Sequence, residues 1–393
     1  MTVGGLVAEF NPFHRGHAYC VDQLRRQGIT HLVAVMSGSF VQRGDAAVCD
    51  KGTRAEMALA GGVDLVLELP LPFAAATAQR FALGGVGTLA ALGCVERLGF
   101  GSECGDAARL ERAAALLETE AVRSELRRLL GEGMPFAAAR QQALTEAGGE
   151  GALLARPNDT LAIAYLQANA ALGHPLTPTA VRRMGAGHDG APDGGIASAS
   201  WIRQRLADGD EAAAVPYLTP ESAALLTRER EAGRCPASLD RLETAMLAAL
   251  RTRTEEQLAA LPDVSEGLEH RLYRAIREAG SVADILDAVK VKRYTHARLR
   301  RILLYALLEL DRGVWSDRPR YLHVLAMNER GRELMAACRP TLPWITRAKD
   351  RERLDEAGRR MWEAECRADD LFALAQPTVQ PCGRTLTQGV IIR

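Results

Sequence analysis

The feature that most constrains the fold is a regular alternation of short apolar runs and helical segments in the first hundred residues. Each run has the length of a strand and is mostly apolar, as buried strands of a parallel sheet are. Strands that alternate with helices favour a parallel sheet with right-handed crossovers. The runs are residues 5–10, 31–38, 63–70 and 94–101, and the helical segments cover about 15–28, 51–61 and 72–92.

A further strand pattern follows at 179–185, after four helical segments. The Gly- and Asp-rich stretch 185–195 is typical of a mobile loop. Beyond about residue 215 strand patterns fade, although 317–331 can hold one short strand. We therefore predict an α/β fold with two domains. A Rossmann-like, nucleotidyltransferase-type domain with a parallel sheet covers 1–210, and a mainly helical domain covers 211–393.

The charge balance and the spacing of the cysteines restrict which partners and sites the protein can have. Lys plus Arg and Asp plus Glu each number 49, so a nucleic-acid partner would have to meet a local basic patch. The 8 cysteines form no CxxC pair, which argues against a zinc site and a disulfide framework. We expect reduced, mostly buried thiols. No signal peptide and no apolar stretch of about 20 residues is visible, so we expect a cytoplasmic protein without a membrane segment.

Two histidines follow the first apolar run, in the stretch NPFHRGH. His14 and His17 are three residues apart, so they share one face of the first helical turn. Such a helix N-terminus attracts phosphate through its free N–H groups and its dipole. Gly16 between them would let a phosphate approach the backbone. Two imidazoles there could donate hydrogen bonds to charge that grows on a phosphate in a transition state.

Two other roles stay open for these histidines. A metal site would need further ligands, and none lies near in sequence, so we predict no protein metal site. A structurally packed pair is the second alternative. The polar turn between strand and helix favours phosphate chemistry over packing, without deciding between them.

A second pattern that suits an anion is IASASWIRQRL. Ser198 and Ser200 are placed to cap a helix, and Arg203 lies in its first turn. Hydroxyls, free N–H groups and a guanidinium suit a polyphosphate. An ordinary serine cap would also explain the pattern, so its weight comes from its combination with the two histidines.

Several motifs in a fixed order resemble the bacterial tRNA(Met) cytidine acetate ligases of the HxGH nucleotidyltransferase superfamily. The resemblance spans nearly the whole chain and is densest over 4–104 and 156–206. It implies an enzyme that makes acetyl-adenylate from ATP and acetate, with magnesium expected. The acetyl group then passes to the wobble cytidine of elongator tRNA(Met), giving N4-acetylcytidine. The motifs are EFNPFHRGH, MSGSFVQRGDAAVCDKGTRAEMAL, GVDLVLELP, FGSE, RPND and IASASWIR.

The resemblance also implies roles for named residues. His14 and His17 would bind the α-phosphate and its transition state, and Arg203, the third catalytic residue, would hold the pyrophosphate with the two serines. The implied ATP-binding set is Val7, Ala8, Glu9, Phe10, Asn11, Pro12, Phe13, His14, Gly16, His17, Gly101, Ser102, Asn158, Arg182, Arg183, Ser198, Ser200 and Arg203.

Some of these residues have a second explanation. Asn158 could be the N-cap of the helix that starts with DTLAIAYL. Arg182 and Arg183 point to opposite faces if 179–184 is a strand, so one of them could face away from the nucleotide. We also expect residues on the acetate or tRNA side of the site, namely Ser37, Gly38, Lys51 and Arg54.

A basic run lies at 290–310, KVKRYTHARLRRILLYALLEL. A solvated helix face is the ordinary explanation of such a run. In a chain of zero net charge we favour a patch that follows tRNA phosphates, with Tyr294 and His296 available to stack on bases. The cations are Lys290, Lys292, Arg293, Arg298, Arg300 and Arg301, and the stripe expected to face the core is Leu299, Leu303, Ala306 and Leu310.

Two rival functions are weaker. An adenylyltransferase acting on a small phosphorylated metabolite would need neither the basic helix nor the long helical region. An RNA-binding or scaffold protein would not need intact His14, His17, Ser200 and Arg203. No obligate protein partner is evident.

Overall fold

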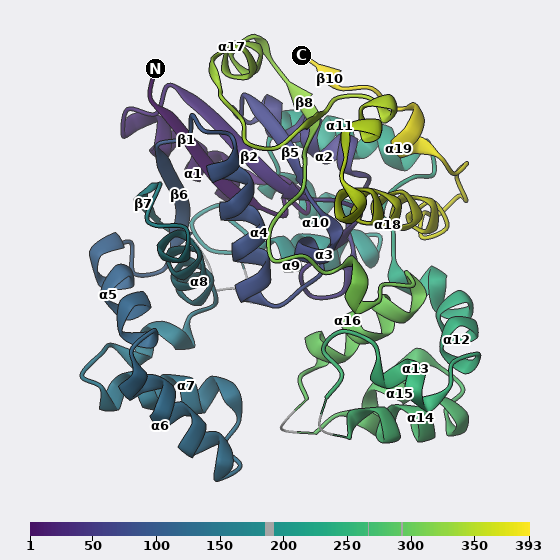
Figure 1. Cartoon of the computed structure of the whole chain (residues 1–393). Helices are drawn as coiled ribbons and strands as arrows, with labels where there is room; N and C mark the ends of the chain where they lie inside the picture. The colour runs from purple at the N-terminus through teal and green to yellow at the C-terminus, as the bar shows by residue number, and fades with distance from the viewer. Residues whose placement is uncertain (185–191, 266, 292–293) are drawn as a thin grey trace.

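A central sheet organises the protein (Figure 1). The computed structural model describes residues 1–184, 192–265, 267–291 and 294–393. The parallel strands are β1 (Val3–Ala8), β2 (His31–Ser37), β5 (Leu65–Leu69), β6 (Arg97–Ser102) and β7 (Thr177–Arg182). They pair in parallel, as the alternating pattern predicts, and lie in the order β5-β2-β1-β6-β7.

The sheet also takes strands from the C-terminal part of the chain. β8 (Leu322–Met327) lies antiparallel beside β5, which confirms the short strand expected within 317–331. β9 (Trp344–Ile345) and β10 (Ile391–Ile392) each pair in parallel with β8. The division of the chain at residue 210 stays a prediction, and the sheet draws strands from both sides of it.

Helices cover both faces of the sheet. They are α1 (Arg15–Arg26) and α2 (Lys51–Ala60) on one face and α4 (Ala78–Ala91) and α8 (Pro157–Ala171) on the other. Successive residues of a strand face opposite cores. In β2, Val35 belongs to the core under α4 and α8, whereas Ala34 belongs to the core under α1 and α2.

The single helix expected over 72–92 is wrong in one respect. α3 (Leu71–Ala74) ends early, and α4 begins anew. Thr77 caps α4 by accepting a hydrogen bond from the N–H of Arg80, and a residue that caps one helix cannot lie inside another.

Two groups of helices extend away from the sheet (Figure 1). The first is α5 (Ala107–Leu117), α6 (Glu120–Gly131) and α7 (Phe136–Glu146). The second is α12 (Glu243–Arg251), α13 (Glu255–Ala259), α14 (Leu268–Glu278), α15 (Val282–Val289) and α16 (His296–Leu307). The second group packs around an apolar core that it shares with residues 40–47, 71–75 and 364–372, and the predicted stripe is buried in it: Leu299, Leu303, Ala306 and Leu310.

Shorter helices and two longer ones complete the fold. They are α9 (Ala199–Ala207), α10 (Glu211–Ala214), α11 (Pro220–Glu231), α17 (Glu329–Ala337), α18 (Glu356–Phe372) and α19 (Arg384–Thr387). Among the residues that the structure describes, no helix has the length and apolarity needed to cross a membrane.

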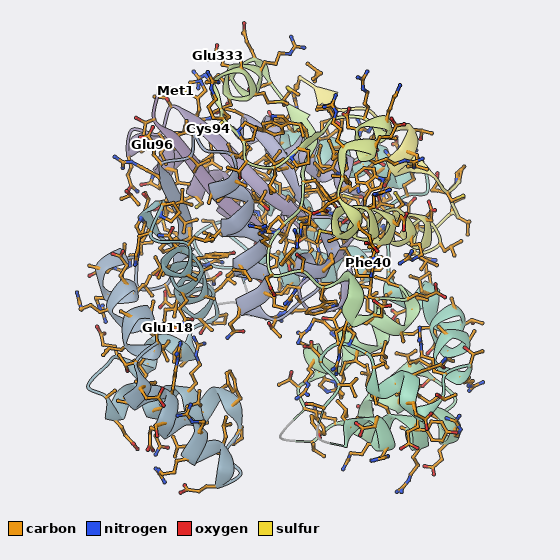
Figure 2. The ribbon with its side chains drawn as sticks, in the orientation of Figure 1. Met1, Phe40, Cys94, Glu96, Glu118 and Glu333 are labelled. Carbon is orange, nitrogen blue, oxygen red and sulfur yellow. A yellow bond between two sulfur atoms is a disulfide. The ribbon has the colours of Figure 1, made fainter. Side chains whose placement is uncertain are left out.

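One expectation about the cysteines is wrong. Cys94 and Cys338 form a disulfide (Figure 2), whereas we expected reduced thiols. They lie 244 positions apart, after α4 and at the end of α17. A search for CxxC motifs detects only cysteines that lie close together in the sequence. It therefore gives no indication of a pair so far apart.

Candidate functional site

A cleft opens at the carboxyl ends of the parallel strands, where α/β sheets bind ligands. Its volume of about 310 Å³ falls in the range of small-molecule sites, about 300–1,000 Å³. The N-terminal turns of α1, α8 and α9 meet the ends of β1, β6 and β7 there. The predicted ATP-binding residues that line it are Val7, Ala8, Glu9, Phe10, Asn11, His14, Gly16, His17, Gly101, Asn158, Arg183, Ser198, Ser200 and Arg203.

The turn after β1 is held from several sides. Phe10 has a φ of 44°, a left-handed conformation that a non-glycine residue keeps only when its surroundings fix it. The side-chain oxygen of Asn11 accepts a hydrogen bond from the N–H of Val48 at 2.7 Å, and its carbonyl accepts one from Arg203 at 2.8 Å. These contacts place His14 at the N-cap of α1.

Hydrogen bonds fix the tautomers of the two histidines. Nδ1 of His14 accepts from the N–H of Gly16 at 3.0 Å, and Nδ1 of His17 accepts from the N–H of His14 at 3.2 Å. A neutral imidazole that accepts through Nδ1 carries its proton on Nε2. The rings stack with centroids 3.8 Å apart, which confirms that they share one face of the first turn. The pair therefore offers two Nε2–H donors to the cleft.

Both imidazoles are neutral at physiological pH. Burial, with the charges of Arg183 and Arg203, lowers the pKa of His14 to about 3. Burial, His14 and Arg183 hold the pKa of His17 well below its ordinary value. This environment suits an anionic ligand, because the guanidinium groups attract it and the imidazoles donate to it.

The α9 N-terminus is built as predicted. Ser198 is its N-cap and accepts from the N–H of Trp201 at 3.2 Å. The hydroxyl oxygens of Ser198 and Ser200 lie 3.0 Å apart. Arg203 reaches across to the carbonyl of Asn11, so the N-termini of α1 and α9 are joined at the cleft.

Two carboxylates lock the end of β6 to the start of α8. Glu103 accepts from Nδ2 of Asn158 at 2.6 Å and from the N–H of Asp159 at 2.8 Å. In return, Asp159 accepts from the hydroxyl of Ser102 at 2.5 Å. Asn158 is therefore not the N-cap considered above. Arg156 holds that position, and Glu103 supplies the capping oxygens.

Of the two neighbouring arginines, Arg183 lines the cleft and Arg182 does not. Arg183 lies against Gly101, whereas Arg182 lies against Gly105, as expected for adjacent residues at a strand end. The other implied ATP-binding residues outside the cleft lining are Pro12, Phe13 and Ser102.

Arg54, expected on the acetate or tRNA side, serves the fold instead. Its buried guanidinium donates to the carbonyls of Glu9 at 2.7 Å and Ser37 at 3.0 Å. It also donates to the carbonyls of Gly38 and Cys49. These groups lie where the ladders of β1 and β2 stop, so Arg54 satisfies acceptors that the sheet leaves unpaired. Ser37 and Gly38 likewise lie outside the cleft lining.

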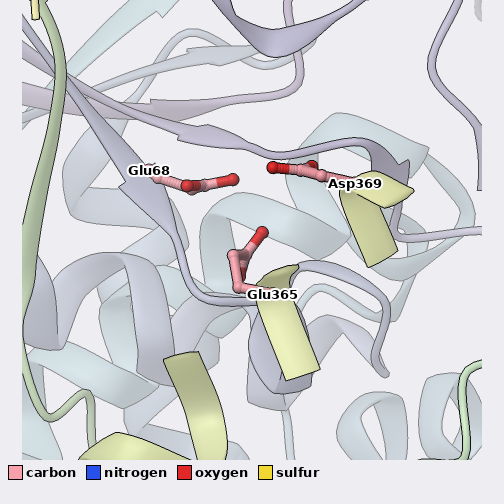
Figure 3. A group of neighbouring side chains, drawn as sticks. All are labelled: Glu68, Glu365 and Asp369. Atoms are coloured by element: carbon pink, nitrogen blue, oxygen red, sulfur yellow. The ribbon is translucent and has the colours of Figure 1, made fainter. Parts of the chain in front are cut away.

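Lys51 belongs to a buried ion network rather than to the cleft. Figure 3 shows three carboxyl groups that converge from β5 and α18, those of Glu68, Glu365 and Asp369. Nζ of Lys51 lies 2.8 Å from Glu68 and 2.6 Å from Asp369. The ammonium thus supplies, from within the chain, the positive charge that a metal ion would bring.

The charges of this network follow from its surroundings. The carboxylates outweigh burial and raise the pKa of Lys51. Burial alone would raise the pKa of Glu68, but Lys51 and His323 lower it. Burial and the charge of Glu68 raise the pKa of Glu365, which favours its protonated form as a hydrogen-bond donor to Glu68.

Comparisons with known proteins agree with this geometry. Residues 1–385 match the family model described as HIGH Nucleotidyl Transferase. The tRNA(Met) cytidine acetate ligase of Syntrophomonas wolfei is 36% identical over 98% of this chain and 98% of that protein. That of Syntrophotalea carbinolica is 41% identical over 88% of this chain and 85% of that protein. The chain belongs to the tRNA(Met) cytidine acetate ligase family.

Solved structures show the same fold for this ligase family. Thermotoga maritima TmcAL bound with alpha-thio ATP matches with a TM-score of 0.93 and 32% identity over 100% of both chains. Its apo form matches equally well, with a TM-score of 0.93. The expected α/β fold with a parallel sheet and a helical remainder is therefore confirmed.

The aromatic residues of the cleft were not predicted from the sequence. Phe81 from α4, Tyr19 from α1 and Tyr165 from α8 line it. The hydroxyl of Tyr165 lies 3.5 Å from the carbonyl of Val7, its hydrogen-bond acceptor. Each of these aromatics has the spacing of an ordinary core residue, so only the packing of the helices over the strand ends reveals them.

The hairpin of the family motif SGSFVQRGD also reaches the cleft. It consists of β3 (Phe40–Val41) and β4 (Asp45–Ala46), and its turn places Gln42 and Arg43 at the lining. The N–H of Gln42 donates to the carboxylate of Glu9 at 3.0 Å, which joins this turn to the end of β1.

The basic run predicted to meet tRNA divides into two kinds of residue. Lys292 and Arg293 lie outside the described residues. Arg301 is buried and pairs with Asp263 at 3.0 Å. Arg298 donates to the carbonyl of Asp263 at 2.8 Å. The tRNA contact of Arg301 stays a prediction, and its guanidinium is already paired with a residue distant in sequence.

The exposed part of this run is smaller than expected. Lys290 and Arg300 are exposed, whereas Tyr294 is buried and not open to a base. A Cβ on Gly44 would lie within 3 Å of the backbone of Arg300 and Arg301. The N-terminal half of α16 therefore packs directly on the hairpin turn that reaches the cleft.

Proposed function

We propose that this chain is an ATP-dependent ligase that activates acetate as acetyl-adenylate and acetylates the wobble cytidine of elongator tRNA(Met). The observation that carries the proposal is the cleft itself. Two neutral imidazoles present Nε2–H donors beside Arg203 and the helix N-terminus at Ser198. The relatives bear the ligase name, and one solved relative is bound with alpha-thio ATP.

In the first step an acetate oxygen attacks the α-phosphorus of ATP, and the bond to pyrophosphate breaks. Acetate is already ionised at neutral pH, so the step needs no general base. Neutral imidazoles suit it, because they stay donors to the charge that grows on the α-phosphate. Arg203 and the α9 N-terminus would hold the departing pyrophosphate.

In the second step the N4 amine of the cytidine attacks the acetyl carbon. The bond to AMP breaks, and the amine loses a proton. The contribution of the enzyme here is positioning, since acetyl-adenylate is already activated. The cleft must therefore stay open to a nucleobase while it holds the adenylate.

Magnesium fits the residues of the cleft. Among the described residues only Glu9 brings a carboxylate to the lining. One or two carboxylates with substrate phosphates form the usual Mg²⁺ set, so Glu9 and the triphosphate would hold the ion. When bound, it would neutralise charge on the pyrophosphate.

For the RNA we propose a path over two exposed cations, Lys290 at the C-terminus of α15 and Arg300 on α16. Lys290 and Arg300 lie outside the fold's ion pairs described above, and Arg300 sits against the hairpin that carries Gln42 and Arg43 to the cleft. A phosphate backbone that follows these cations would bring an unstacked cytidine to the cleft mouth. We place this activity in the cytoplasm, with no membrane partner.

Two assays test the proposal. Acetate-dependent exchange of pyrophosphate into ATP reports adenylation, and labelled acetate incorporated into tRNA(Met) reports transfer. His17→Ala should lower exchange by roughly a hundredfold or more, as loss of a transition-state donor does, and should leave tRNA binding unchanged. Exchange that occurs without acetate but with a phosphorylated metabolite would favour the rival adenylyltransferase instead.

A further inference from the structure

The corner between β6 and α8 fixes the orientation of one amide side chain in the cleft. Glu103 lies at this corner, half-buried under the N-terminus of α8. Its carboxylate accepts from Nδ2 of Asn158 at 2.6 Å and from the N–H groups of Asn158 at 3.2 Å and Asp159 at 2.8 Å. A carboxylate at a helix N-terminus is further stabilised by the helix dipole.

The chemistry of Glu103 decides which end of the amide faces the cleft. Burial would raise the pKa of Glu103, but the hydrogen bonds from Asn158 and Asp159 outweigh it and lower the pKa. An ionised carboxylate only accepts hydrogen bonds, so Asn158 must turn its NH2 group toward Glu103. Its Oδ1 then faces away, and within the described residues no donor bonds to that oxygen.

The corner cannot easily rearrange, because a second carboxylate ties it from the other side. Asp159 is fully buried and accepts from the hydroxyl of Ser102 at 2.5 Å and the N–H of Cys104 at 3.2 Å. Each segment thus satisfies the other's free N–H groups. Asn158 and Gly101, which both line the cleft, are held in fixed positions by this exchange.

We infer that Glu103 is a positioning residue that makes Asn158 a hydrogen-bond acceptor, and that Asn158 thereby selects nucleotides with a donor group at this corner. In ATP that donor is a ribose hydroxyl or the 6-amino group of adenine. Fully ionised phosphate groups carry no hydrogen-bond donor. The acceptor oxygen of Asn158 can therefore bond only to the ribose or the base of ATP. The inference rests on the proposed use of ATP.

Equilibrium binding to the full chain tests it. The ligands are ATP, 2′-deoxy-ATP, 3′-deoxy-ATP and purine riboside triphosphate, which lacks the 6-amino group. The wild type should bind one analogue about threefold to tenfold more weakly than ATP, as loss of one hydrogen bond predicts. Asn158→Ala should bind ATP and that analogue equally. The analogue that is discriminated identifies the donor.

Variants of Glu103 separate positioning from folding. Glu103→Ala frees the amide to rotate and should bring the discrimination below about twofold. Glu103→Gln keeps an oxygen for the amide and should retain most of it. If Glu103→Ala fails to fold, Glu103→Asp takes its place, since it keeps a negative charge beside the α8 N-terminus but is one methylene too short to hold the backbone N–H groups and the amide together. Asp106→Ala, which removes the α5 cap in the same loop, is the matched control and should discriminate as the wild type does.

The outcomes are distinct. A wild type that binds ATP but discriminates against no analogue overturns the inference alone. Full discrimination in Glu103→Ala, with a folded protein by thermal unfolding, overturns the role of Glu103. A wild type that does not bind ATP overturns the proposed function and the inference with it.

Discussion

The histidines of the NPFHRGH turn act through their neutral form. Each uses Nδ1 to accept a backbone N–H, and each keeps its proton on Nε2. Protonation would add positive charge beside Arg183 and Arg203 and would break both backbone hydrogen bonds. The turn therefore couples the integrity of the α1 N-terminus to the same tautomer that a phosphate ligand needs.

Acid should destabilise the protein through these histidines. The folded-state pKa of His14 is about 3, below the ordinary 6.5 of an unfolded chain. Its stabilisation is therefore complete above pH 6.5 and is lost as the pH falls toward 3. Between pH 7 and pH 5 this residue alone should remove about 2 kcal/mol from the free energy of unfolding. Denaturant titrations at the two pH values measure the loss.

His14→Asn is the matched variant, because an asparagine can still cap α1. Its stability should fall less between pH 7 and pH 5 than that of the wild type. An equal fall in both proteins would show that His14 does not carry the effect.

Residue roles were predictable where the local sequence sets them. His14, His17 and Ser198 act through backbone groups within three positions, so spacing alone places them. Arg54 and Arg301 are different, because their partners lie at Ser37 and Asp263 and depend on the fold. A cation in a sequence shows its charge but not the group that will hold it.

At the level of elements, the Lys51 network joins α2, β5 and α18. Lys51→Met should lower the free energy of unfolding by about 3–5 kcal/mol, because it leaves buried carboxylates without a counter-charge. Glu365→Gln should change it by less than about 1 kcal/mol, because burial and Glu68 favour the neutral form of Glu365, and an amide keeps its bonds to Glu68 and to the N–H of Leu71. Urea titration of both variants checks this, and equal losses would contradict the assigned charges.

Two adjacent arginines of α16, Arg300 and Arg301, should respond differently to substitution. Arg300→Ala should weaken tRNA binding and reduce its salt slope by about one unit while leaving the unfolding midpoint near that of the wild type. Arg301→Ala should lower stability instead, since it leaves Asp263 without its buried partner. Binding measured from low to high salt, beside thermal unfolding, separates the two. A salt slope unchanged in Arg300→Ala would remove α16 from the RNA path.

Elements were predicted well where periodicity is strong and caps are local. Asp50 caps α2 and Ser198 caps α9, and these signals mark the helix starts. The break at Thr77 was missed because the alanine-rich stretch around it favours an uninterrupted helix. The capping hydrogen bond that decides the break is visible only in the structure.

For the whole molecule, the disulfide between Cys94 and Cys338 ties α4 to α17. Closing so long a loop restricts the unfolded chain, so reduction should lower the free energy of unfolding by about 2–4 kcal/mol. Denaturation with and without dithiothreitol measures this. The double variant Cys94→Ser, Cys338→Ser is the control and should not respond to reductant. A wild type equally indifferent to reductant would contradict the prediction.

The α/β class followed from the strand and helix alternation, but the full sheet did not. β8 has a strand pattern no stronger than other apolar runs in the helical region. Its place beside β5 depends on the pairing of Leu65 with Met327, and no local signal reports a partner so distant.

This pairing determines when the edge of β5 is covered during synthesis of the chain. β5 leaves the ribosome long before β8, and synthesis at about 5–20 residues per second separates them by roughly ten to fifty seconds. During that interval one edge of β5 has no neighbour, and open strand edges recruit other chains. During the same interval Glu68 on β5 lacks its hydrogen-bond partner His323, which lies on β8. A cell that makes this protein must keep that edge covered until the last fifth of the chain arrives.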